Sequence, residues 1–283
     1  MFEKVKSFFA VQDMTEGKIS HNIIRFSVPL LIGNLAQQLY QTVDAIIVGQ
    51  SVPGGLAAIG TTGPIMNFMI IIFMALATGA GVMVSQSFGA KDYAKLRRII
   101  ANTIMLLVIS SLVLMAIVIP LAPHLLELLN TPEEIVGMSQ DYLSIMFMGI
   151  MGMALYNISS GILRGLGDSF SPLLLLILAT VINTVLDIYF VWFQGWGVAG
   201  AAWATIIAQA ISAVLSLIRL FQIDFLHPYR KEDIKPRWAI IKEIYHLGIP
   251  AGLTQGIFSI AMLLVQNVIN QMGTLVIEAN TAV

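Results

Sequence analysis

The chain has 283 residues, of which 57% are hydrophobic and only 11% are charged, and its net charge is −1. A soluble domain carries about 25% charged residues, so this chain is too apolar to bury its hydrophobic surface around one core in water. The near-neutral charge offers no basic surface for nucleic acid, and the absence of cysteine excludes disulfides and thiolate metal sites. The composition therefore predicts a protein whose main partner is the lipid bilayer.

Hydrophobic segments long enough to cross a membrane follow one another along the chain. A helix needs about 20 mainly apolar residues to cross the hydrocarbon core. We predict seven such helices, over residues 23–48, 62–87, 99–121, 139–162, 172–193, 197–221 and 243–269, and an eighth apolar stretch begins near Leu275. The fold class is thus an all-α polytopic membrane protein.

The predicted helices divide the chain into four parts. We expect residues 1–22 to form a cytoplasmic segment and residues 23–221 to form a six-helix transmembrane bundle. Residues 222–242 are the predicted cytoplasmic linker, and residues 243–283 the beginning of a second bundle that is incomplete in this sequence.

The basic residues predict the orientation of these helices. If the helices cross as predicted, all 15 Lys and Arg residues fall on the side of the membrane that holds the N-terminus. Loops rich in Lys and Arg stay in the cytoplasm, so we expect a multi-pass protein of the cytoplasmic membrane with a cytoplasmic N-terminus.

The seventh predicted helix repeats features of the first. Pro250 aligns with Pro29, and each helix follows a charged cytoplasmic approach. Six helices separate one copy from the next, which predicts a parallel repeat of the kind found in two-bundle transporters. Two unrelated apolar helices that each contain a proline are the alternative.

Two acids lie well inside the apolar segments, Asp44 and Asp187. Charges inside a bilayer cost about 2.5–3.5 kcal/mol each on insertion scales, so such residues are expected to be functional. Asn183 precedes Asp187 by four residues and shares its helical face, and Thr205 follows on the next predicted helix. These oxygens suit a hard cation such as Na⁺, and two neighbouring carboxyl groups could instead share a proton. Alternatively, Asp44 lies near the end of its helix and is hydrated, and Asp187 forms a hydrogen bond that holds two helices together.

Other polar side chains are candidates for a substrate cavity. Gln37 and Gln41 lie on the same helical face as Asp44, and Asn157 lies within the fourth predicted helix. Alternatively, these amide side chains form hydrogen bonds between helices and do not contact a substrate. Pro29 lies inside the first predicted helix, where it is expected to bend the helix either permanently or as a hinge.

Five motifs together resemble the multidrug and toxic compound extrusion (MATE) family. They occur at the matching helices in the matching order, and they read PLLIGNLAQQLYQTVDAIIVGQ, GAGVMVSQSFGAKD, GILRGLGDSFSP, NTVLDIYFVW and GVAGAAWATIIAQ. The resemblance implies twelve helices in two bundles, of which this chain holds the first bundle and the seventh helix. It also implies a cation-coupled antiporter of small organic cations in which Asp44, Asn183, Asp187 and Thr205 bind the coupling ion, and in which a bend at Pro29 accompanies ion binding.

One branch of that family places an acid in the seventh helix. This chain has Gln255, Gln266 and Asn267 there instead, so it resembles the DinF-like branch that keeps the ion site in the first bundle. The resemblance implies Na⁺ or H⁺ as the coupling ion, and we expect no other cofactor or metal.

Three other functions fit parts of the sequence. A lipid-linked oligosaccharide flippase shares the two-bundle plan, but its cavity is expected to be strongly basic, and no Lys or Arg lies in the middle of a predicted helix. An intramembrane enzyme needs catalytic histidines or paired acids near one interface, and the pattern offers neither, so we expect no enzyme.

A non-transporting subunit would need a separate partner; as it stands, the chain lacks most of the second bundle that transport requires.

Overall fold

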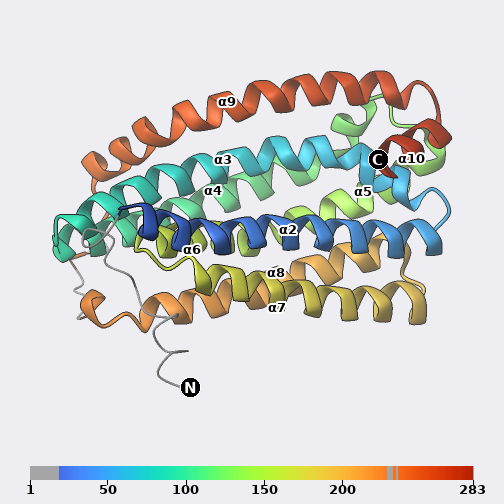
Figure 1. Cartoon of the computed structure of the whole chain (residues 1–283). Coiled ribbons are helices and arrows are strands. Elements are labelled where there is room, and N and C mark those ends of the chain that lie inside the picture. The colour runs from blue at the N-terminus through green and yellow to red at the C-terminus, as the bar shows by residue number, and fades with distance from the viewer. Residues whose placement is uncertain (1–18, 228–231, 234, 283) are drawn as a thin grey trace, which may run out of the picture.

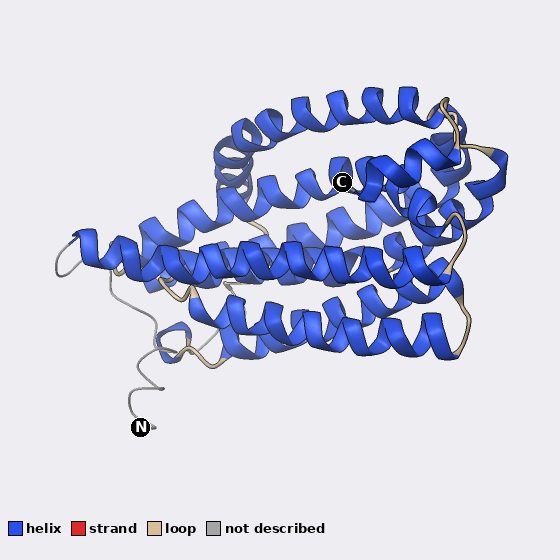
Figure 2. Ribbon diagram, turned by 45° about the vertical axis from the view of Figure 1, so that its right-hand side comes forward, coloured by secondary structure: helices blue, strands red, loops and turns tan. Residues whose placement is uncertain are grey.

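The computed structural model describes residues 19–227, 232–233 and 235–282, so most of the predicted cytoplasmic segment 1–22 lies outside the described residues. The described part contains helices and no strand (Figure 2). This confirms the predicted all-α fold class.

Long helices run back and forth across the molecule (Figure 1). In chain order they are α2 (Ile19–Ser51), α3 (Gly55–Gly89), α4 (Tyr93–Leu128), α5 (Glu133–Met148), α6 (Ile150–Gly165), α7 (Phe170–Asp187), a π-helix (Ile188–Phe193), α8 (Gly197–Phe221), a short 3₁₀ turn (Asp224–Leu226), α9 (Trp238–Asn270) and α10 (Thr274–Ala282). We call the end at which α2, α4, α7 and α9 begin the basic end, because all described Lys and Arg side chains belong to the helix termini and connections there.

The helices are long and apolar enough for a membrane. Within the described residues, five single helices (α3, α4, α7 with its π-helical extension, α8 and α9) could each cross, and the bent pair α5–α6 could form a sixth span. The helix α2 is as long as α9, but it is less apolar because it carries several glutamines and Asp44. Large apolar side chains such as Leu35, Val185 and Phe258 are exposed, as expected for surfaces that face lipid.

The fourth predicted helix, residues 139–162, is wrong in one respect, because the structure breaks it into two. The helices α5 and α6 meet at Gly149 and differ in direction by 51°. A Cβ atom at Gly149 would collide with the side chain of Ile206 on α8, so the glycine permits a close approach of α8 at the bend. Glycines are a common cause of sharp helix kinks.

The helix α9 lies alongside α3 on the outside of the six-helix bundle (Figure 1). Small residues permit this close contact: a Cβ atom on Gly79 would collide with the backbone of Ile244, and one on Gly248 would collide with the backbone of Ala75. Like α2, α9 has 33 residues and contains a proline, and both helices run away from the basic end. These features agree with the predicted parallel repeat.

Hydrogen bonds attach α9 and α10 to the first bundle at the end opposite the basic end. Asn267 and Asn270 donate their amide hydrogens to the carbonyl oxygens of Leu128 and Leu129, at 2.7 and 2.9 Å. The backbone N–H of Gly54 donates to Glu278 of α10 at 3.1 Å. The two helices beyond residue 221 are therefore held against the bundle that precedes them.

Candidate cation site

The two predicted acids lie on neighbouring helices in the half of the bundle far from the basic end. Asp187 is the last residue of α7 and is completely buried, and the π-helix follows it directly. Asp44 is partly buried on α2, which packs against both α7 and α8. Since α2 continues to Ser51, Asp44 lies about two turns inside the helix, and the alternative of a hydrated Asp44 stays a prediction.

The carboxyl groups of Asp44 and Asp187 face each other within hydrogen-bonding reach. Both oxygens of Asp187, Oδ1 of Asp44 and Oδ1 of Asn183 are buried and have no hydrogen-bond donor. The four orphan acceptors, as we call these oxygens, belong to side chains on only two helices. A buried acceptor without a partner costs about 1–3 kcal/mol, so a cation or a hydrogen-bond donor that binds these oxygens would stabilise the site.

Two donors fix the geometry around the acids without satisfying them. The amide of Asn183 donates to the hydroxyl oxygen of Thr205 on α8 at 3.3 Å, and the phenol of Tyr40 donates to the same oxygen at 3.2 Å. These bonds tie α2, α7 and α8 together at Thr205. Thr205, a predicted ion ligand, thus acts as an acceptor for its neighbours in this arrangement.

The electrostatics of the site favour a cation. None of the ion pairs found among the described residues involves Asp44 or Asp187. No group of three or more His, Cys, Asp or Glu side chains in the described part could hold a metal ion, so the ligand set consists of two carboxylates and neutral oxygens. Such oxygens suit Na⁺, and a single proton placed between the two carboxyl groups would equally provide the missing donor.

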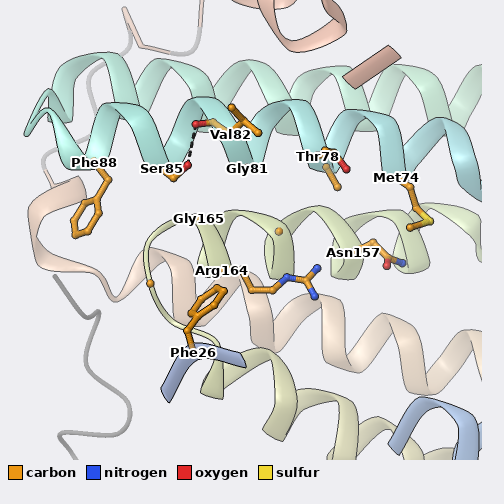
Figure 3. Close-up of a pocket in the computed structure, with 14 residues that line it drawn as sticks. Phe26, Met74, Thr78, Gly81, Val82, Ser85, Phe88, Asn157, Arg164 and Gly165 are labelled. Atoms are coloured by element: carbon orange, nitrogen blue, oxygen red, sulfur yellow. Dashed lines mark hydrogen bonds between the residues drawn. The ribbon is translucent and has the colours of Figure 1, made fainter. Parts of the chain in front are cut away.

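Two cavities lie closer to the basic end. The larger, which we call the α3–α6 cavity, has a volume of about 550 Å³ and is lined by residues of α2, α3, α6 and the turn after α6 (Figure 3). The smaller, of about 60 Å³, lies between α2, α6 and α7. Asn157 lines both cavities, and Gln37 and Pro29 line the smaller one. Gln41 is exposed and lines neither cavity, so the structure separates it from the other predicted substrate residues.

The predicted hinge lies within an unbroken helix. Residues 19–51 form a single α-helix that includes Pro29. A hinge at Pro29 therefore stays a prediction.

Sequence reasoning missed two residues of these sites. Tyr142 of α5 is buried and close enough to Asp44 and Asp187 to interact electrostatically with both, although nothing in its local sequence indicates this. Arg164, assigned from the sequence to a cytoplasmic connection, lies in the last turn of α6 and lines both cavities. Its spacing of seven residues from Asn157 places both on one helical face, and this signal was available.

The chain matches known proteins over most of its length. The family model MatE matches residues 29–189. "Probable multidrug resistance protein YpnP" of Bacillus subtilis is 32% identical over 96% of this chain and 61% of the relative, and "Probable multidrug resistance protein NorM" of Thermotoga maritima is 25% identical over 93% and 57%. These relatives are named as resistance proteins and not as enzymes, which agrees with the prediction.

A solved structure has the same arrangement of helices. It is described as the inward-facing conformation of a multidrug resistance MATE family transporter, and it superposes with a TM-score of 0.83 at 28% identity. The match covers 92% of this chain and 60% of that one, so the chain spans about 60% of the length of these relatives. The helices and the family match together show a multi-pass membrane protein that belongs to the MatE family.

Proposed function

We propose that this chain is the ion-binding part of a cation-coupled antiporter that exports organic cations. The four orphan acceptors carry this proposal, because they form a buried, acidic site without a donor. The proposed coupling ion, Na⁺ or H⁺, would supply the missing positive charge. Because the chain spans about 60% of its relatives' length, transport is proposed for a protein with both bundles.

The helix α2 offers a way to couple the ion to a substrate. It carries Asp44 at the ion site and Pro29 and Gln37 in the smaller cavity. An ion between Asp44 and Asp187 would hold them together, and its loss would let the two carboxylates repel each other and shift α2 relative to α7. The same movement would change the cavity wall. Ion and substrate would then compete through the position of one helix, as antiport requires.

Two further observations support the direction and the substrate class. The described basic residues gather at one end, which favours that end as the cytoplasmic one. The relatives named above are called multidrug resistance proteins, and an acidic site attracts cationic compounds. The flippase alternative finds less support, because Arg164 is the one basic side chain among the residues that line the two cavities.

Transport by the complete protein in proteoliposomes tests the proposal. An imposed Na⁺ or proton gradient should drive ethidium movement in the wild type, and Asp187→Asn should remove this response. Asp141→Asn is the matched control, because Asp141 is an exposed acid in the same half of the bundle. Gradient-driven transport that survives Asp187→Asn at the wild-type rate would contradict coupling at this site.

A further inference from the structure

The α3–α6 cavity contains a cation for which the described residues provide no acid. Arg164 lines the cavity and is exposed to it, and none of the ion pairs of the described part involves this residue. The other polar groups that line the cavity, such as Asn157, Thr78 and Ser85, are neutral. The cavity therefore has a positive charge that is not neutralised by its own walls.

The side chain of Arg164 points into the molecule, away from the basic end. Figure 3 shows its guanidinium lying along α6 in the direction of Asn157, while Phe88 marks the basic end of α3. This direction follows from helix geometry, since side chains tilt toward the N-terminus of their own helix and α6 ends at the basic end. An arginine near the end of a membrane helix usually turns its charge toward the headgroups, and this one does the opposite.

A second arginine nearby shows what a purely structural role looks like. Arg219 at the end of α8 donates to the buried Asp168 at 3.1 Å and to the hydroxyl of Ser171 at 3.1 Å. Asp168 in turn accepts hydrogen bonds from the backbone N–H and the hydroxyl of Ser171 at the start of α7. That arginine is paired by the fold, so the unpaired state of Arg164 is not a general property of this end of the bundle.

The remaining walls of the cavity are apolar and adapted to a bulky group. Phe26, Phe88 and Met74 line it, and glycines let α3 and α6 approach closely: a Cβ atom on Gly165 would lie 2.8 Å from the carbonyl oxygen of Gly81. A volume of about 550 Å³ is in the range of sites for drug-sized molecules.

From these observations we infer that the α3–α6 cavity binds an amphiphile whose anionic head, a phosphate or a carboxylate, pairs with Arg164 while its apolar body lies against α3. Guanidinium groups match both kinds of anion with two parallel hydrogen bonds. The head can belong to a membrane lipid or to a free amphiphile, because both present the same chemistry. This site is separate from the cation site and binds a ligand of the opposite charge.

Binding to the purified protein in phosphatidylcholine nanodiscs tests this inference. Dodecyl phosphate is the anionic probe, and dodecyltrimethylammonium, with the same apolar chain, is the cationic control. We expect dodecyl phosphate to bind more tightly, and Arg164→Gln to weaken its binding about tenfold or more while Arg164→Lys retains part of it. Arg237→Gln, which removes an exposed arginine at the same end but outside the cavity, should leave binding within about twofold.

Nanodiscs that contain phosphatidylglycerol identify the source of the head group. If phosphatidylglycerol displaces dodecyl phosphate from the wild type but not from residual sites in Arg164→Gln, the ligand is a lipid. If phosphatidylglycerol does not compete with dodecyl phosphate, the ligand is a free amphiphile. Equal binding of the two probes, or unchanged binding in a folded Arg164→Gln protein, would overturn the inference. Neither result would bear on gradient-driven transport, which Asp187→Asn tests separately.

Discussion

The cation site and the α3–α6 cavity differ in the sign of the charge that each leaves unbalanced. Around Asp44 and Asp187 the fold gathers acceptors and provides no cation, whereas around Arg164 it provides a cation and no acid among the described residues. The paired arrangement of Arg219 with Asp168 shows that the same chain can balance a buried charge when the role is structural. Unbalanced charge in this bundle therefore marks the places where a ligand is expected.

The largest effect should come from removing the acids of the cation site. Asp44→Asn and Asp187→Asn should each lower gradient-driven export about tenfold or more, and the double variant should be no worse than either alone, because the two groups hold one ion. Export rates in proteoliposomes provide the measurement. Losses that multiply in the double variant would indicate that the two acids act independently.

The structural pair at the basic end should matter chiefly for stability. Asp168→Ala removes the carboxylate that pairs with Arg219 and two hydrogen bonds at the start of α7, so we expect a loss of about 3 kcal/mol in the free energy of unfolding. Thermal unfolding in detergent measures this effect. A variant as stable as the wild type would mean that the pair does not hold α7 and α8 together.

The acids of the cation site should show the opposite behaviour. Asp187→Asn replaces a buried carboxyl group whose oxygens accept no hydrogen bond, so in Na⁺-free buffer it should raise the unfolding free energy by about 1 kcal/mol. Asp168→Asn is the matched comparison. The buried carboxylate of Asp168 has its partners, so this substitution should lower the unfolding free energy. If Asp187→Asn were as destabilising as Asp168→Asn, the acid would have a structural partner after all.

The smallest effect is expected at Tyr40. Tyr40→Phe removes one hydrogen bond to Thr205 and leaves the ring, so the unfolding free energy should fall by about 1 kcal/mol or less. Transport should continue with a weaker dependence on the coupling ion, since the hydroxyl positions Thr205 and Asn183 only indirectly. A complete loss of coupling in Tyr40→Phe would show that the phenol itself binds the ion.

Apolar length and helical spacing account for what the sequence predicts well. The sixth predicted helix, residues 197–221, has the observed bounds of α8. Apart from the fourth, which is broken at Gly149, the others differ mainly by extra turns at their ends. Asp187 and Asn183 share a helical face in any α-helix, so their meeting at one site follows from a spacing of four residues. Their approach to Asp44 requires α2 to pack against α7, which the spacing alone does not determine.

The features that the sequence does not reveal depend on contacts between helices. The bend at Gly149 lies where Ile206 of α8 approaches the glycine, and the π-helix after Asp187 changes the helix phase without any marker such as proline. Arg164 looks like an ordinary loop residue until α6 is seen to extend to Gly165, where its face turns toward the cavity.

Cation binding to the purified protein tests the central claim most directly, because the four orphan acceptors lie entirely within this chain. Binding of radioactive Na⁺, together with the proton release that accompanies it, should show one saturable cation site in the wild type and none in Asp187→Asn, with Asp141→Asn unchanged. If protons alone are bound, proton uptake should be lost in the same variant. Equal Na⁺ binding and proton uptake in the wild type and Asp187→Asn would contradict the assignment of this site.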